Sequence, residues 1–138
     1  MSETTLLKRN KDMARKPLSN CHEGKGILDH ISVLNREDIP GSMLCFFHDN
    51  ILAPGVSIGE HTHSRHYEMY YIVSGNGTMI LDGEEHEIRE GDISVVCPGG
   101  SHALINSSDK DIRMIVVCVE DNIAACDSQG CFRLFKAA

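Results

Sequence analysis

Short runs of apolar or alternating apolar and polar residues recur along most of the chain, and turn-forming residues separate them. Many short runs of this kind, broken by glycine, proline and asparagine turns, are typical of a β-sandwich or β-barrel. Asp82-Gly83, between two such runs, is a strong signal for a two-residue hairpin. The pattern therefore predicts an all-β chain, with strands at 43–48, 51–53, 67–73, 78–81, 84–88, 93–97, 102–105, 112–119 and 132–135.

The first part of the chain has a different pattern. The only helix that the sequence favours lies near residues 4–16. Residues 1–16 carry five basic and two acidic side chains, a net charge of +3, whereas residues 17–138 carry eight basic and 18 acidic ones, a net charge of −10. A basic arm can contact nucleic acid or a membrane, but a solvated terminus is the commoner case. We therefore expect a flexible basic segment at 1–20, followed by a single β-barrel domain at 21–138.

Length, composition and charge narrow the class of protein. A chain of 138 residues is expected to form one domain. Its net charge of −7 and its aromatic content of 5%, with no tryptophan, argue against a nucleic-acid partner. No apolar run is long enough to span a membrane, and nothing resembles a secretory signal. We therefore expect a cytoplasmic protein with no nucleic-acid or membrane partner.

The six cysteines are scattered and include no CxxC pair, so they do not indicate a disulfide framework. Cys45, Cys97 and Cys118 lie in apolar runs and are expected to be small buried residues. Cys126 and Cys131 could bind a metal or pair with each other, and both roles stay open.

Eight histidines are many for an acidic chain with few aromatic residues, and two of them form the sequence His61-Thr62-His63. On a strand, positions i and i+2 point to the same face, so both imidazoles could reach one metal ion. The pair alone is a weak signal, because such pairs are more often surface or core residues. Glu68 follows five residues after His63, and it shares their face only if residues 64–66 turn or bulge. His102 opens another strand and is a fourth candidate ligand.

Together these residues resemble the two sequence motifs of the cupin superfamily. The first motif has the form G-x5-H-x-H-x3,4-E-x6-G, and the second has the form G-x5-P-x-G-x2-H-x3-N. The chain fills every fixed position of the first motif, with Gly55, His61, His63, Glu68 and Gly75. It fills the second with Gly91, Gly99, His102 and Asn106, and has Cys97 where the motif has a turn-shaping proline. The 15 residues between Gly75 and Gly91 match the short spacing of small single-domain cupins.

The resemblance implies a jelly-roll barrel, or double-stranded β-helix, that holds one divalent transition metal. By the same resemblance, the ligands would be His61, His63, Glu68 and His102. Three neutral imidazoles and one carboxylate leave a divalent ion with a net charge of +1, and they suit Fe, Mn, Ni, Co, Cu or Zn. Small cupins are commonly dimers, and both faces of the run at 67–73 are apolar, so a homodimer is expected.

Alternation along the strands adds two pocket candidates. His48 shares a face with Phe46 and Asn50, and Tyr70 shares a face with Glu68. Both are expected to line the barrel interior, although Tyr70 could equally be a core aromatic with its hydroxyl satisfied locally. Among the other histidines, His66 is expected in an exposed turn and His86 on a solvated outer strand, while His22 and His30 have no assigned role.

The motifs allow more than one function. An enzyme acting on a small organic molecule is favoured, either of a dioxygenase type or of a Lewis-acid isomerase or lyase type. The alternative is a non-catalytic module that binds or senses a small ligand, since one fold hosts many functions. A strongly anionic substrate is less expected, because few basic residues lie in the barrel region: Arg65, Arg89, Lys110 and Arg113. Of these, Arg113 begins a long strand and could face inward. A metal could itself bind a carboxylate, however.

Overall fold

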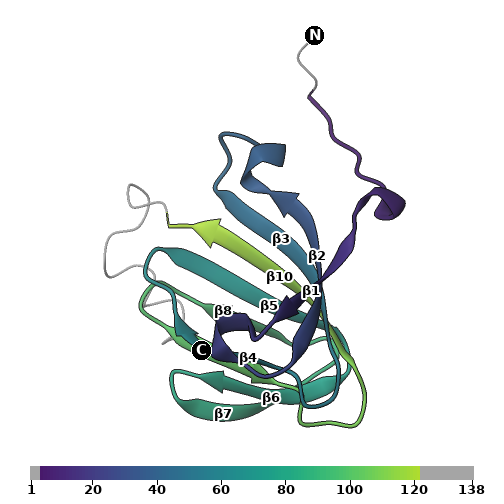
Figure 1. The fold of residues 1–138 in the computed structure, drawn as a ribbon. Helices are drawn as coiled ribbons and strands as arrows, with labels where there is room; N and C mark the ends of the chain where they lie inside the picture. Colours follow the sequence, from purple (N-terminus) through teal and green to yellow (C-terminus); the bar gives the residue numbers. More distant parts are fainter. Residues whose placement is uncertain (1–3, 122–138) are drawn as a thin grey trace.

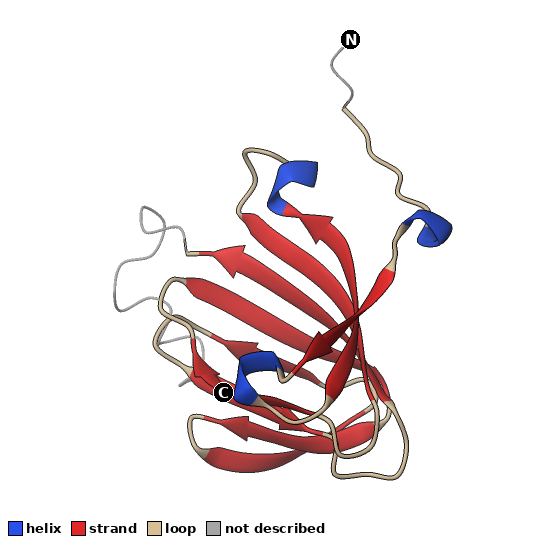
Figure 2. Cartoon of the chain, in the orientation of Figure 1, coloured by secondary structure: helices blue, strands red, loops and turns tan. Residues whose placement is uncertain are grey.

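The computed structural model describes residues 4–121, which form ten β-strands in two sheets that pack face to face (Figures 1 and 2). All strand pairs are antiparallel. The predicted all-β jelly-roll architecture is therefore confirmed. Within residues 4–121 there is no α-helix, and no helix is long and apolar enough to cross a membrane.

The larger sheet has six strands, and its centre is the most β-branched run of the chain. The strand at 112–120 pairs with a neighbour on each side, which fits its run of isoleucine and valine. The order across the sheet is β1 (Arg15–Ser19), β2 (Ile27–Asn35), β3 (Leu44–Leu52), β10 (Ile112–Glu120), β5 (His66–Ser74) and β8 (Ile93–Val96).

The smaller sheet has four strands and ends in the predicted hairpin. Its order is β4 (Ser57–Thr62), β9 (Ser101–Ile105), β6 (Asn76–Leu81) and β7 (Glu84–Arg89). Asp82 and Gly83 join β6 to β7 with φ values of 49° and 82°, the positive values that a tight hairpin turn of this type requires. The edge strand β7 is charged and exposed except at Ile88, so His86 faces solvent as expected.

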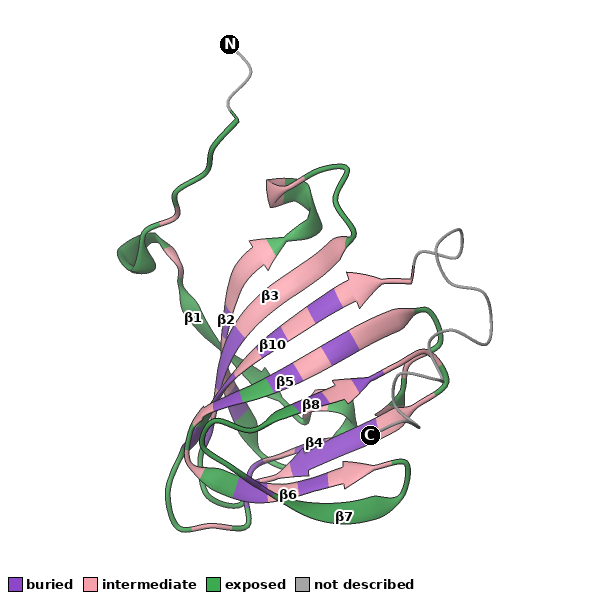
Figure 3. Cartoon of the chain, turned by 180° about the vertical axis from the view of Figure 1, so that it is seen from behind, coloured by how far each residue is buried: buried purple, intermediate pink, exposed green. Residues whose placement is uncertain are grey.

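The core lies between the two sheets. Buried positions alternate with less buried ones along β5 and β10, as Figure 3 shows. This is the period of two that a half-buried antiparallel strand requires. The core cluster is made of Leu28, Leu52, Val56, Ile58, Tyr70, Ile72, Met79, Ile88, Leu104, Ile112, Met114 and Val116.

The first part of the chain differs from its prediction. The expected helix at 4–16 is wrong: this stretch has one 3-10 turn, η1 (Asn10–Asp12), and then enters β1. β1 pairs with β2 along five residues, so tertiary pairing overrides the weak local helix propensity. Pro17 is tolerated because β1 is an edge strand, where one N–H is not needed. Part of the expected segment 1–20 therefore belongs to the barrel sheet.

Besides β1, two further strands were missing from the sequence prediction, namely β2 and β4. Asp29, His30 and Ser32 interrupt the apolar pattern of β2, and Gly59 and Glu60 interrupt that of β4. Both strands form because they pair with neighbouring strands, β3 and β9. The strand expected at 132–135, like Cys126 and Cys131, lies outside the described residues.

Candidate metal centre

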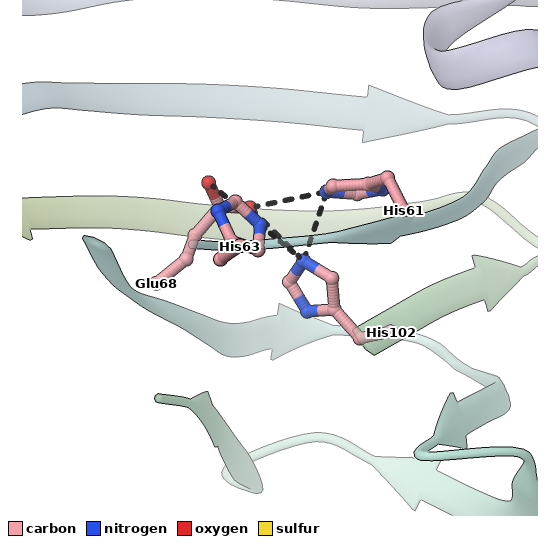
Figure 4. A group of neighbouring side chains, drawn as sticks. All are labelled: His61, His63, Glu68 and His102. Carbon is pink, nitrogen blue, oxygen red and sulfur yellow. Dashed lines mark hydrogen bonds and ion pairs between the residues drawn. The ribbon is translucent and has the colours of Figure 1, made fainter. Parts of the chain in front are cut away.

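Three histidines, two on strands of the smaller sheet and one just after its strand β4, point their rings at one spot. His61 on β4 and His102 on β9 are direct cross-strand partners, and their Nε2 atoms are 3.0 Å apart. His63 follows the end of β4, and its Nε2 lies 3.1 Å from that of His102 (Figure 4). The HxH pair therefore does share a face, as the sequence predicted.

Glu68 reaches the same spot from β5 of the opposite sheet. Its carboxylate oxygens lie 3.2 Å from the Nε2 of His102, 3.6 Å from that of His63 and 3.9 Å from that of His61. The chain between β4 and β5 leaves the strand at residues 63–65, which is the turn that the odd spacing of Glu68 required. One donor atom from each of the four residues lies within 4.8 Å of the others, so the group could hold a metal ion.

The turn after β8 positions His63, although His63 is not part of a regular strand. The N–H of Gly99 donates to the carbonyl of His63 at 2.6 Å, and the N–H of His63 donates to the carbonyl of Gly100 at 3.0 Å. Gly99 has a φ of 93°, which explains the glycine at this place in the motif. The turn also closes on itself, because Gly100 donates to the carbonyl of Cys97 at 2.9 Å. The turn therefore forms with Cys97 at the position where the motif has proline.

The hydrogen bonding of His61 fits a cation at the centre of the group. Its Nδ1 lies 2.8 Å from the carbonyl oxygen of Gly59, and a carbonyl only accepts, so Nδ1 carries a proton. In the neutral ring, Nε2 then carries a lone pair, which points to the centre of the group and can bind a metal ion. Three imidazole nitrogens and one carboxylate are a donor set that first-row transition metals accept. The Nδ1 of His102 is buried and has no hydrogen-bond partner among the described residues.

The histidine neighbours of Glu68 keep its carboxyl group ionised. Burial alone would raise the pKa of this carboxyl, but the hydrogen bonds from His102 and His61 and the charge of His63 outweigh burial and hold it well below its usual range. Burial also acts to lower the pKa of His61, yet the hydrogen bonds to Glu68 and Gly59 raise it overall. Burial lowers the pKa of His63. A proton on His61 or a bound cation can therefore balance the buried carboxylate.

Tyr70 lies directly behind the group, on the inner face where alternation placed it. Its side chain is 2% exposed, and its ring stacks on His102 with centroids 4.4 Å apart. Burial, followed by the charge and hydrogen bond of Glu68, raises the pKa of Tyr70 well above its usual value of 10. The hydroxyl therefore stays protonated and can donate to Glu68.

His48 lies on the inner face of β3 within a small aromatic cluster. It stacks on Phe46, with centroids 4.1 Å apart, and meets the edge of His30 at 4.3 Å. The Nδ1 of His30 is 2.7 Å from the Oδ1 of Asn50. Burial and the neighbouring His30 lower the pKa of His48 to about 4, so its ring is neutral near pH 7. His48 can exchange hydrogen bonds with a ligand but does not supply positive charge.

His22 is a site residue that the sequence did not identify. It lies in the 3-10 turn η2 (Cys21–Glu23), and its ring stacks on that of His61, with centroids 3.6 Å apart. Gly24 and Gly59 are the only trace of this contact in the sequence, because η2 and β4 come too close there for a Cβ atom. Two glycines do not reveal which segments meet, since the approach is a tertiary contact between residues far apart in the chain.

Several other residues differ from their predicted environments. His66 is not in an exposed turn: it is the first residue of β5 and is half-buried. Cys118 is buried as expected, whereas Cys45 and Cys97 are only partly buried, and all four described cysteines are free thiols. Arg113 does not face inward, because it forms an ion pair with Asp49 on the outer face.

Comparisons with known proteins agree with this fold. A sequence model of the cupin domain matches residues 50–118. A curated relative, the oxalate-binding protein of Thermotoga maritima, is 28% identical over 116 residues, which cover 84% of this chain and 95% of the relative. A crystal structure of a predicted oxalate decarboxylase from Thermotoga maritima superposes with a TM-score of 0.78 at 28% identity, covering 83% of this chain and 99% of that one.

More distant structures share the fold alone. The structure of KdgF from a Halomonas species has a TM-score of 0.69 at 17% identity, and it covers 89% of this chain and 100% of its own. The polyketide cyclase RemF from Streptomyces resistomycificus has a TM-score of 0.65 at 19% identity, covering 83% of this chain and 80% of its own. The different names of these proteins show that the barrel does not by itself determine the substrate.

Proposed function

This chain belongs to the cupin family, and we propose that it uses one divalent transition metal, bound by His61, His63, Glu68 and His102, to act on a small organic carboxylate. The observation that carries the proposal is the convergence of three imidazole Nε2 atoms and one carboxylate at a single point between the sheets. When bound, the metal supplies a Lewis acid and, if it is iron or copper, a redox centre.

We propose a carboxylate as the ligand because the metal ion would be the main positive charge near the site. Arg113 is occupied by Asp49 on the outer face, and His48 is neutral near pH 7. A divalent ion on three neutral imidazoles and one carboxylate carries a net charge of +1, so the metal itself attracts an anionic group. The name of the Thermotoga maritima relative makes oxalate the first compound to test.

The chain's own residues have distinct tasks in this proposal. Tyr70 holds Glu68 and His102 in place through its protonated hydroxyl and its stacked ring. His48, which is neutral near pH 7, and its neighbours His30 on β2 and Asn50 on β3 offer polar groups on the inner face of the larger sheet. Such groups can orient a small ligand by hydrogen bonding while its carboxylate binds the metal ion.

We favour turnover, by dioxygenase-type chemistry or by Lewis-acid lyase or isomerase chemistry, over binding alone. The donor set supports turnover, because three imidazoles and one carboxylate would leave positions on a divalent ion open for a substrate and for water or dioxygen. Non-catalytic binding is the second candidate, and it is favoured by the name oxalate-binding protein of the relative.

Metal analysis followed by calorimetry tests the proposal. Protein purified without added metal should contain at least one equivalent of a transition metal and should bind oxalate. His61→Ala and His102→Ala should each contain one equivalent less than the unaltered protein and should no longer bind oxalate, while His86→Ala, on the exposed edge strand β7, should keep both properties. Less than a tenth of an equivalent of metal in the unaltered protein, or full metal content in His61→Ala, would refute it. Release of carbon dioxide or consumption of dioxygen would then separate turnover from binding.

A cytoplasmic homodimer remains part of the proposal. Tyr71 and Ile93 are cross-strand partners on the outer face of the larger sheet, and they are 44% and 58% exposed. A second copy of the chain would cover these apolar side chains. Light scattering should report a dimer that Ile93→Asp dissociates and that Ile27→Asp, equally exposed at the other side of the sheet, does not.

A further inference from the structure

A second group of metal-ligating side chains lies next to the first along β5. A ligand atom from each of Cys45, His66 and Glu120 lies within 4.8 Å of the other two. His66 and Glu120 are cross-strand partners on β5 and β10, and the next inward pair along these strands is Glu68 and Cys118. Because two residues of a strand span about 7 Å, the second group is one pleat away from Glu68. The three side chains are partly buried, so the place is accessible from solvent.

A bulge directs Cys45 toward this group. Cys118 pairs with Phe46, whereas Val119 pairs with Leu44, so Cys45 has no partner residue on β10. Strict alternation would place Cys45 on the face opposite to Phe46, and a bulge at this point turns the extra side chain back. The backbone before Cys45 is held against β10, because the N–H of Glu120 donates to the carbonyl of Met43 at 2.8 Å.

A positively charged side chain already bridges two members of the group. Arg36, in the 3-10 turn η3 (Arg36–Asp38), places Nη2 2.7 Å from a carboxylate oxygen of Glu120 and donates to the Sγ of Cys45 at 3.3 Å. Its side chain is 48% exposed, so it can turn away into solvent. The group therefore already binds one positive charge, the guanidinium of Arg36. A metal ion bound by the same side chains would displace it.

We propose that Cys45, His66 and Glu120 form a second metal site, separate from the first group, that binds a thiophilic divalent cation such as Zn²⁺. Thiolate, imidazole and carboxylate are the three ligand types that zinc accepts in proteins, and the first group has no thiolate. On binding, the Cys45 thiol releases its proton to solvent and Arg36 leaves Glu120.

Cobalt separates the two sites, because only a bound thiolate produces the near-ultraviolet sulfur-to-cobalt charge-transfer band. The full chain, freed of metal and titrated with Co²⁺, should take up two equivalents and develop this band. Cys45→Ser should take up one equivalent and show no band, and retained uptake at the first site shows that it is folded. Cys97→Ser, at another partly buried cysteine, and His61→Ala, at the first group, should both keep the band.

Two further variants distinguish a metal site from a merely structural cluster. Glu120→Gln should raise the Co²⁺ concentration that half-saturates the band at least tenfold. Arg36→Gln should lower that concentration several-fold, because it removes the competing cation. A band that survives in Cys45→Ser, an unaltered protein that shows no band, or weaker binding in Arg36→Gln would each overturn the proposal.

Discussion

The ring of His22 stacks on the ring of His61, with centroids 3.6 Å apart and planes 10° from parallel. The contact depends on an unusual backbone, because His22 and Glu23 have φ values of 50° and 64°, in the left-handed region. It also depends on the close approach of η2 to β4, where a Cβ on Gly59 would overlap the carbonyl oxygen of His22. The chain thus maintains a strained turn against a candidate metal ligand, which is typical of functional sites.

His22 is therefore expected to fix the orientation of His61 and to increase metal affinity. His22→Ala removes the stacked ring, and the affinity for the metal should fall about tenfold, the lower end of the effect of residues that support ligands. Competition with a chromophoric chelator measures this. His22→Phe should restore most of the affinity, since it keeps a ring, and His86→Ala is the distant control. An affinity for His22→Ala within twofold of the unaltered protein would contradict this role.

The sequence predicts the first metal group better than its surroundings. His61, His63, Glu68 and His102 are recognisable because strand alternation and motif spacing are local, and even a turn between His63 and Glu68 follows from the odd position of Glu68. His22 reaches this group through contact between η2 and β4, and Cys45 joins the second group through a register shift between β3 and β10. These contacts depend on which strands pair and in which register, and residues far apart in the chain decide both.

His48 should make stability depend on pH in mildly acidic solution. Its folded pKa is about 4, below its ordinary 6.5, because burial and His30 disfavour the charged ring. As the pH falls from 6.5 toward 4, the unfolded chain takes up a proton that folded His48 refuses, so the free energy of unfolding decreases. After allowance for solvent screening of this half-buried ring, the loss is about 1–2 kcal/mol.

His48→Phe, which can still stack on Phe46, isolates this effect. Urea unfolding of both proteins at several pH values should show the unaltered protein losing stability relative to His48→Phe between pH 6.5 and 4. Below pH 4 the two curves should run parallel, since His48 is then protonated in both states. A difference that stays constant from pH 7 to pH 4 would mean that the His48 ring is not held neutral.

Asp49 is the buried member of an ion-pair network on the outer face of the larger sheet. Arg113 donates to both of its carboxylate oxygens, at 3.2 and 2.9 Å, and Arg15 approaches at 3.5 Å. Asp49 is 7% exposed, so Asp49→Ala leaves two arginines without their acceptor and should cost about 1–2 kcal/mol, a buried-pair value reduced for the exposed arginines. Asp29→Ala removes only the exposed partner of Arg15 and should cost much less. Equal unfolding midpoints for the two variants in urea would contradict this assignment.

Asn106, the last position of the second motif, holds the β9–β10 loop closed. It is 1% exposed, and its Nδ2 donates to the carbonyls of Leu52 at 2.8 Å and Lys110 at 2.7 Å. Its Oδ1 accepts from the N–H of Ser108 at 3.0 Å and from the Ser108 hydroxyl at 2.7 Å. The amide thus uses both hydrogens and its oxygen at once, and no other side chain of this length offers two donors and an acceptor.

Asn106→Ala should therefore destabilise the fold without removing a metal ligand. Two carbonyls lose their donor, and unsatisfied buried groups cost about 1–3 kcal/mol each, so we expect a loss of about 2–4 kcal/mol in urea unfolding. Asn106→Asp keeps the acceptors, loses both donors and adds a buried charge, so it should be at least as destabilised. Asn76→Ala, at an exposed position of β6, should change little. The folded Asn106→Ala protein should still bind one metal ion at the first group, and a loss of metal with unchanged stability would instead place Asn106 in the site.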